Sequence, residues 1–275
     1  MVGVADLEFR RDLYRGLAAD YDRYRLRYPQ ALAEHLSNRA AVHPPGRLLD
    51  LACGPGLLAF ALHDRFAQTW AVDAEPDMID FVRAKASGMA DIRPVTCAAE
   101  ELAAPDGSFD LVVIGNAFHR LRRSAVAALV FGWLRPGGHL ALAWTDSPWN
   151  GDAPWQAALR EIMHRWRPAD RVPDGYEQDR RERPDLTVLA GAGFETLGEY
   201  RFAVEHEWTA ETITGFMMAT SVHSRAALGD DAPAFEADLR RELLTHSLDG
   251  TFPQTLSFAY ELARHPDTCS LTPMA

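Results

Sequence analysis

The stretch Leu48-Leu-Asp-Leu-Ala-Cys-Gly-Pro-Gly56 decides the fold of this chain. It is an apolar run that contains one acid, Asp50, and it ends in a Gly-x-Gly turn. A short helical pattern at 57–66 follows, and a second apolar run then ends in the acid Asp73. The glycines allow a ligand to approach the backbone, and a carboxylate at the end of the second strand can accept hydrogen bonds from both hydroxyls of a ribose. The stretch therefore predicts half of a nucleoside-binding site.

Helical and strand patterns alternate downstream of this stretch. Helices are expected at 76–86 and 123–134, and strands at 92–97, 109–115 and 139–145. A turn at Pro136-Gly-Gly138 separates the last helix from the last strand. Strands separated by helices imply right-handed crossovers and parallel pairing. The predicted fold class is therefore α/β, with a Rossmann-like, doubly wound and mostly parallel sheet.

The patterns divide the chain into three regions. Residues 1–46 are predicted to form an N-terminal helical cap, and 47–146 the Rossmann-like cofactor-binding core. Residues 147–275 are predicted to complete the sheet and to add a helical, substrate-binding insertion near the C-terminus. Within them, 167–185 is polar and proline-rich, which indicates a long surface loop. Because open α/β sheets bind ligands at the carboxyl ends of their strands, the cap and the insertion are expected to wall the pocket.

Composition limits the partners and the compartment. The 275 residues have a formal net charge of −11 and no long basic run, which argues against nucleic acid or an anionic membrane as the main partner. The short basic cluster Arg120-Leu-Arg-Arg123 is expected at a solvated helix start. No apolar run is long enough to span a membrane, and the first residues lack the apolar region of a signal peptide. Cys53, Cys97 and Cys269 are widely spaced, so neither a disulfide framework nor a metal site is expected, and a cytoplasmic location fits.

The glycine turn by itself allows two kinds of cofactor. Gly54-x-Gly56-x-x-Ala59, followed by Asp73, approximates the fingerprint of an NAD-dependent oxidoreductase. Two features disagree with that interpretation. Asp50 lies inside the first strand, where dinucleotide enzymes usually have an apolar residue, and Leu134-Arg-Pro-Gly-Gly-His-Leu140 has no role in a dinucleotide fold.

Both features match another family. Five segments of this chain match the motifs of that family in the right order. They are Leu48–Gly56, Val72-Asp-Ala-Glu-Pro-Asp-Met78, Ala99-Glu-Glu-Leu102, Phe109-Asp-Leu-Val-Val113 and Leu134-Arg-Pro-Gly-Gly138. The chain resembles the class I S-adenosylmethionine-dependent methyltransferases, most closely their small-molecule branch. The segment from Ala19 to Pro29 resembles the N-terminal cap of that branch, and beyond residue 150 the resemblance is thin. It implies S-adenosylmethionine as cofactor and a small-molecule methyl acceptor; we expect a monomer or a homodimer.

The resemblance also implies roles in cofactor binding. Asp50 would orient the glycine turn and reach the ammonium group, and Asp73 would bind the ribose diol. Ala52, Cys53 and Gly54 would present backbone to the amino-acid end of the cofactor, and Gly56 would let the helix start close by. Ala74 and Met78 would pack on the adenine, and Ala99 and Glu100 would flank its edge. Tyr21 would lie over the sulfonium and Asn116 beside it. Arg25 or Arg27 would meet the cofactor carboxylate. Many family members have Asp where this chain has Ala98, so the adenine contacts differ here.

Acceptor binding and catalysis are expected just beyond the strand 109–115. His119 is the candidate general base, because an unperturbed imidazole titrates near neutral pH. The family often has Trp at the next position, where this chain has Arg120. Tyr14, Trp149 and Phe216 are expected to contact the acceptor, although each could instead be a packing residue. We expect O-methylation in secondary metabolism; the alternatives are a methyltransferase-fold protein with other chemistry and the NAD-dependent oxidoreductase.

Overall fold

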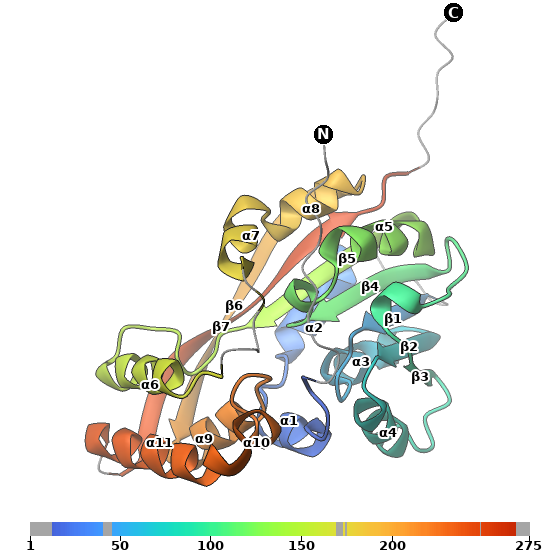
Figure 1. The fold of residues 1–275 in the computed structure, drawn as a ribbon. Helices are drawn as coiled ribbons and strands as arrows, with labels where there is room; N and C mark the ends of the chain where they lie inside the picture. Colours follow the sequence, from blue (N-terminus) through green and yellow to red (C-terminus); the bar gives the residue numbers. More distant parts are fainter. Residues whose placement is uncertain (1–12, 41–45, 169–172, 174, 248, 268–275) are drawn as a thin grey trace, which may run out of the picture.

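The computed structural model describes residues 13–40, 46–168, 173, 175–247 and 249–267. One seven-stranded sheet has the order β3-β2-β1-β4-β5-β7-β6 (Figure 1). Its strands are β1 Arg47–Leu51, β2 Gln68–Asp73, β3 Ile92–Thr96, β4 Phe109–Gly115, β5 Leu134–Thr145, β6 Glu195–Thr209 and β7 Thr251–Arg264. Strands β1 to β5 pair in parallel, whereas β7 is antiparallel to both β5 and β6. The predicted α/β, Rossmann-like and mostly parallel fold is confirmed.

Helices cover both faces of the sheet. Leu48 and Leu111 belong to a buried cluster with residues of α2 (Gln30–Arg39) and α3 (Leu57–Leu62). Leu49 and Val112 point to the other face, where α5 (Arg123–Trp133) and α8 (Asp185–Gly191) supply the partners. Successive side chains of a strand point to opposite faces, so the near-continuous apolar runs of β1 and β4 fill both layers. Helix α4 (Pro76–Lys85) packs on β2 and β3.

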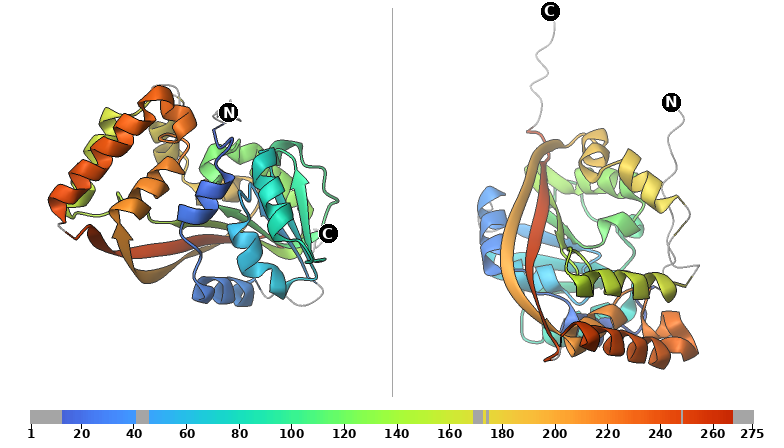
Figure 2. Two further views of the ribbon diagram at one scale, coloured as in Figure 1. Left: turned by 90° about the horizontal axis from the view of Figure 1, so that it is seen from below. Right: turned by 90° about the vertical axis from the view of Figure 1, so that its left-hand side faces the viewer.

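A second group of helices lies beside the carboxyl ends of the strands. It consists of α6 (Pro154–Arg165), α9 (Ala210–Met218), α10 (Arg225–Leu228) and α11 (Ala232–His246), and α11 packs on both α6 and α9. Figure 2 shows β6 and β7 as long, curved strands that reach this group. Helix α1 (Ala18–Tyr24) contacts both α9 and α4 and so connects the group to the core. The predicted insertion is thus divided between the β5–β6 and the β6–β7 connections.

Two local predictions were wrong. The loop predicted at 167–185 contains helix α7 (Tyr176–Glu182), whose Asp179 pairs with the buried Arg123 of α5. Periodicity cannot detect a helix that depends on a partner 56 positions away. Likewise, Pro136–Gly138 lies inside β5, where the pairing moves from Phe109↔Leu134 to Leu111↔His139. The segment therefore forms a bulge within the strand.

The remaining elements are short. They are the 3-10 turns His63–Arg65, Ala99–Glu101, Phe118–Arg120 and Gly229–Asp231. Among the described residues, no helix has both the length and the apolar character that a membrane span requires.

Candidate active site

A cavity of about 310 Å³ opens at the carboxyl ends of β1, β2, β3 and β4. Twelve of the residues predicted for the site line it, namely Tyr14, Tyr21, Asp50, Ala52, Cys53, Gly54, Asp73, Ala74, Met78, Ala99, Glu100 and Asn116. Gly56, His119, Trp149 and Phe216 are not among the lining residues. The parallel strands explain this clustering, because their carboxyl ends meet at one edge of the sheet.

The turn after β1 has an unusual backbone. Ala52, Gly54 and Gly56 all have positive φ, of 55°, 55° and 84°. A Cβ atom at Gly56 would lie 2.9 Å from the ring of Phe60, so only glycine fits there without a shift. The buried Asp50 accepts a 2.7 Å hydrogen bond at Oδ2 from the N–H of Ala59 in α3. The acid therefore ties the end of β1 to the helix that follows the turn.

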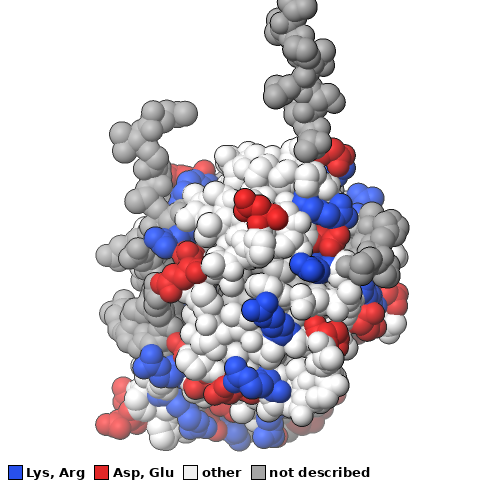
Figure 3. Space-filling model, turned by 90° about the vertical axis from the view of Figure 1, so that its right-hand side faces the viewer, with Lys and Arg blue, Asp and Glu red and all other residues white. Residues whose placement is uncertain are grey.

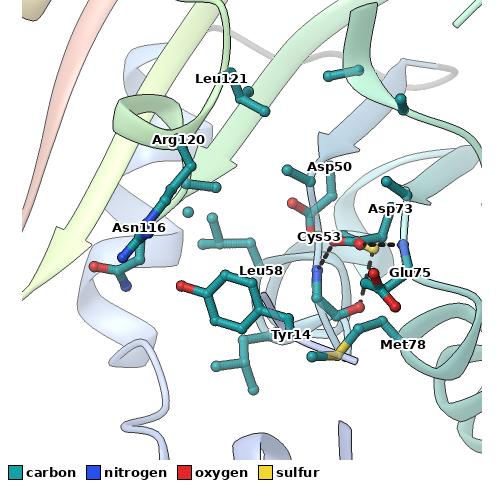
Figure 4. Close-up of a pocket in the computed structure, with 18 of the residues that line it drawn as sticks. Tyr14, Asp50, Cys53, Leu58, Asp73, Glu75, Met78, Asn116, Arg120 and Leu121 are labelled. Atoms are coloured by element: carbon teal, nitrogen blue, oxygen red, sulfur yellow. Dashed lines mark hydrogen bonds between the residues drawn. The ribbon is translucent and has the colours of Figure 1, made fainter. Parts of the chain in front are cut away.

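Asp73 joins the loops that follow β1 and β2. Its Oδ2 accepts the N–H of Gly54 at 2.8 Å, and its Oδ1 accepts the N–H of Glu75 at 2.9 Å. Figure 4 shows Asp50, Asp73 and Glu75 on one side of the pocket, with Cys53 among them. Three carboxyl groups on one wall favour a ligand that brings positive charge and hydroxyl donors.

Burial changes the protonation of this wall. It raises the pKa of Asp50 to about 8, an effect that the nearby Asp73 increases. Burial also raises the pKa of Asp73 and that of the Cys53 thiol. Cys53 therefore fits the role of a small neutral residue in the turn, and its Sγ–H donates to the carbonyl of Gly54 at 3.3 Å.

The opposite side of the cavity is formed by the loop after β4. Asn116 has a φ of 52°, and its Nδ2 donates to the hydroxyl of Tyr28 at 3.1 Å. Its Oδ1 accepts the N–H of Thr145 at 3.3 Å, which anchors the loop to the end of β5. Figure 4 shows Arg120 on the same side as Asn116. The two walls thus differ in charge.

His119 lies in the 3-10 turn that follows β4, and neither it nor the two predicted aromatic contacts, Trp149 and Phe216, line the cavity. Arg120 Nε–H donates to His119 Nε2 at 3.3 Å, and the ring of Tyr176 approaches the imidazole edge-on at 6.2 Å. Burial, together with the charges of Arg120 and three further arginines, lowers the pKa of His119 to about 3. Trp149 and Phe216 pack against each other at 5.8 Å. The roles of these three residues remain predictions.

Comparisons with known proteins identify the family. A family model described as a methyltransferase domain matches residues 48–138. An uncharacterized methyltransferase of Mycobacterium tuberculosis, Rv3342, is 33% identical over 57% of this chain and 62% of its own length. The human methyltransferase-like protein 27 is 32% identical over 59% of this chain and 68% of its own length. The chain belongs to the class I S-adenosylmethionine-dependent methyltransferases.

A solved structure shows the same fold over most of the chain. It is described as a type II methyltransferase from Anaeromyxobacter dehalogenans, is 22% identical, and has a TM-score of 0.63. The alignment covers 89% of this methyltransferase and 99% of that structure. The family membership replaces the NAD-dependent alternative that the glycine turn alone had left open.

The residues of this methyltransferase fit the cofactor of its family. The acidic wall matches a sulfonium and an ammonium, Asp73 is an acceptor at the end of β2, and Met78, with 2% exposure, offers an apolar surface for a purine. Sequence reasoning missed several lining residues, which are Leu13, Tyr28, Leu57, Leu58, Glu75, Cys97, Ala98, Gly115, Ala117, Arg120, Leu121 and Arg122. Glu75 lies inside the quoted segment Val72–Met78, and Arg120 was visible as a departure from the family pattern.

Proposed function

We propose that this protein transfers the methyl group of S-adenosylmethionine to an oxygen atom of a small molecule. The observation that supports this most directly is the acidic wall, where Asp73 is held by the N–H of Gly54 beside the buried Asp50. The bound donor would supply a methyl group already activated by the sulfonium. The protein then has to align the acceptor with that carbon and exclude water.

The two walls support the cofactor roles that the family resemblance implies. Asp73 would bind the ribose diol, since each carboxylate oxygen retains a further acceptor site beside its backbone bond. Asp50 would bind the ammonium group, and Asn116 would lie beside the sulfonium. The other lining residues would contact the amino-acid end (Ala52, Cys53, Gly54), the adenine (Ala74, Met78, Ala99, Glu100) and the donor from above (Tyr21).

Arg25 is the better candidate for the cofactor carboxylate. Arg27 pairs with Asp22 at 2.8 Å, and its side chain is 53% exposed. The guanidinium of Arg25 instead lies 4.8 Å from the ring centre of Tyr21, which lines the cavity, and 4.4 Å from that of Phe216. Within the part of the chain that the structure describes, Arg25 forms no ion pair with a carboxylate. Its charge is therefore available for an anion brought by the ligand.

Binding of S-adenosylhomocysteine should release a proton near neutral pH. Burial raises the pKa of Asp50 from 3.8 to about 8, so the free protein holds this carboxyl group protonated at about pH 7. The ammonium group of the ligand favours the ionised form, so affinity should increase from about pH 6 to about pH 7.5. The unfolded chain holds fewer protons than the folded one in this range, so the free protein should lose stability as the pH rises.

The proton release is measured by titration calorimetry in buffers of different ionisation enthalpy. Asp50→Asn should bind more weakly and release no proton through this group. Binding by the wild type without any buffer-dependent heat would argue against the ammonium role of Asp50.

Activity is tested by supplying S-adenosylmethionine with a panel of phenols, alcohols, amines and carboxylic acids. Formation of S-adenosylhomocysteine that depends on a phenol, an alcohol or a carboxylic acid supports the proposal, whereas turnover with amines alone would contradict transfer to oxygen. Binding of S-adenosylhomocysteine without turnover on any acceptor would favour the alternative of a methyltransferase-fold protein with other chemistry.

Other expectations from the sequence remain predictions. They are a place in secondary metabolism, the cytoplasm, a monomer or homodimer, and the absence of a nucleic-acid or membrane partner. On the face shown in Figure 3, basic and acidic side chains of the described residues are interspersed.

A further inference from the structure

We propose that this protein forms a homodimer in which the β6 strands of two copies pair antiparallel, edge to edge. Strand β6 is the terminal strand of the sheet, and β7 is the strand that it pairs with among the described residues. It has 15 residues, whereas strands of about five or six are common. Figure 2 shows it curving along the border of the sheet. The outer N–H and C=O groups of such an edge strand are a template for another strand.

Little protects this edge against pairing. A bulge between Thr196 and Gly198 disrupts the first part of β6, but the register with β7 is regular from Gly198 to Thr209. This regular stretch contains neither proline nor lysine, the residues that commonly block sheet edges. The stretch is therefore open to a second strand, and its side chains decide which strand fits.

One face of the stretch has a row of half-buried aromatic and aliphatic side chains. The row consists of Tyr200, Phe202, Val204 and His206. Helix α2 covers part of it, because the ring of His35 lies 4.9 Å from that of Tyr200 and 5.5 Å from that of Phe202. The same row on a second β6 strand would cover more of these side chains and stabilise the pair.

The opposite face of the stretch carries exposed charges of both signs, which are Glu199, Arg201, Glu205 and Glu207. Arg201 is 60% exposed and pairs with Glu199 of its own strand. Glu205 accepts a 2.9 Å hydrogen bond from the hydroxyl of Thr255 in β7. Glu207 forms no ion pair within the part of the chain that the structure describes. It can therefore pair with a cation from a second copy.

Charge complementarity selects one register for the two strands. The copies are related by a two-fold axis, so opposite residues are symmetric about one central residue. With Val204 at the centre, each Arg201 lies opposite Glu207 of the second copy. The symmetry forms this ion pair twice, and no like charges of 199–209 lie opposite each other.

The neighbouring registers are less favourable. With any other residue of 201–205 at the centre, at least one pair of like charges lies directly opposite. A centre at Ala203, for example, places Glu199 opposite Glu207 of the second copy. Like charges in this position destabilise a strand pair. The register centred on Val204 is therefore the one that we assign to the dimer.

The test measures the oligomeric state of the full chain by sedimentation velocity over a range of concentrations. The buffer contains about 0.15 M salt, which screens the repulsion between two chains of net charge −11. The wild type should dimerise with a dissociation constant on the order of 10 µM. Arg201→Glu places like charges opposite each other twice, so it should raise this constant by about 30-fold or more.

Two further variants make the test specific. Combining Arg201→Glu with Glu207→Arg restores opposite charges across the interface and should restore the dimer. Arg240→Glu reverses a cation of α11 whose side chain is 49% exposed, and should leave the dissociation constant unchanged. None of the three exchanged residues lines the cavity, so affinity for S-adenosylhomocysteine should stay the same in every variant.

Hydrogen exchange locates the interface on the chain. The outer N–H groups of 199–209 gain partners in the dimer, so their exchange should slow as the concentration of the wild type rises. In Arg201→Glu, exchange in this segment should not depend on concentration.

Three results would overturn the inference. One is a wild type that stays monomeric even at millimolar concentration. Another is a dimer that Arg201→Glu does not weaken, which would place the interface elsewhere. The third is rescue of Arg201→Glu by Glu205→Arg instead of Glu207→Arg, which would contradict the register. The dimer does not depend on a bound ligand, so a failure to bind S-adenosylhomocysteine would contradict the proposed function alone.

Discussion

Asp73→Ala should weaken the affinity for S-adenosylhomocysteine by about 100-fold or more, because two charge-assisted hydrogen bonds to the ribose would be lost. Asp73 also accepts the N–H groups of Gly54 and Glu75, so its removal loosens both loops that contact the ligand. Asp73→Asn retains an acceptor oxygen for one of these bonds and should fall between Ala and wild type. Titration calorimetry measures each dissociation constant.

The control for this prediction is Asp80→Ala. Asp80 lies on α4, its side chain is 71% exposed, and it forms a surface ion pair with Arg83. Its replacement should leave the affinity unchanged. A dissociation constant of Asp73→Ala close to that of the wild type, in a protein with a normal circular dichroism spectrum, would remove Asp73 from ribose binding.

Arg123→Ala should destabilise the fold by about 3 kcal/mol, because it leaves two largely buried carboxylates with one arginine partner each instead of two. The Arg123 side chain is 3% exposed and pairs with Asp179 and Asp185 at 2.7 Å each. It also donates to the carbonyl of Arg183 at 2.7 Å, so it connects α5 with α7 and α8. Urea denaturation monitored by circular dichroism gives the free energy of unfolding.

Arg83→Ala is the matched control, because Arg83 is 58% exposed and its ion pair with Asp80 lies at the surface. Its loss should change the stability by less than about 1 kcal/mol. Equal midpoints for the two variants would show that the buried network does not stabilise the fold. The solvated position expected for the cluster 120–123 is wrong for Arg123, although Arg122 is 45% exposed.

The sequence predicted those parts of the site that depend on local patterns. The apolar run, the glycines and the two acids Asp50 and Asp73 lie within 26 consecutive residues, 48–73, and parallel pairing brings them together. The contributions of Tyr14 and Tyr21 could be placed only through the family resemblance. Their position depends on the packing of α1 against α4, which no periodicity encodes.

The acceptor end of the site was harder to predict for a physical reason. Arg120 was noted as a departure from a pattern, but its direction depends on the 3-10 turn Phe118–Arg120 and on the packing of α7 over His119. Helix α7 in turn depends on ion pairs with Arg123. Such contacts between distant segments decide which side chain faces the cavity, and only the structure shows them.

The central claim is that the cavity at the carboxyl ends of β1 to β4 binds S-adenosylmethionine. Titration calorimetry of the full chain with S-adenosylhomocysteine, and separately with NADH, tests this claim most directly. The account predicts saturable binding of S-adenosylhomocysteine at one site per chain and no heat from NADH. Binding of NADH without binding of S-adenosylhomocysteine would contradict it.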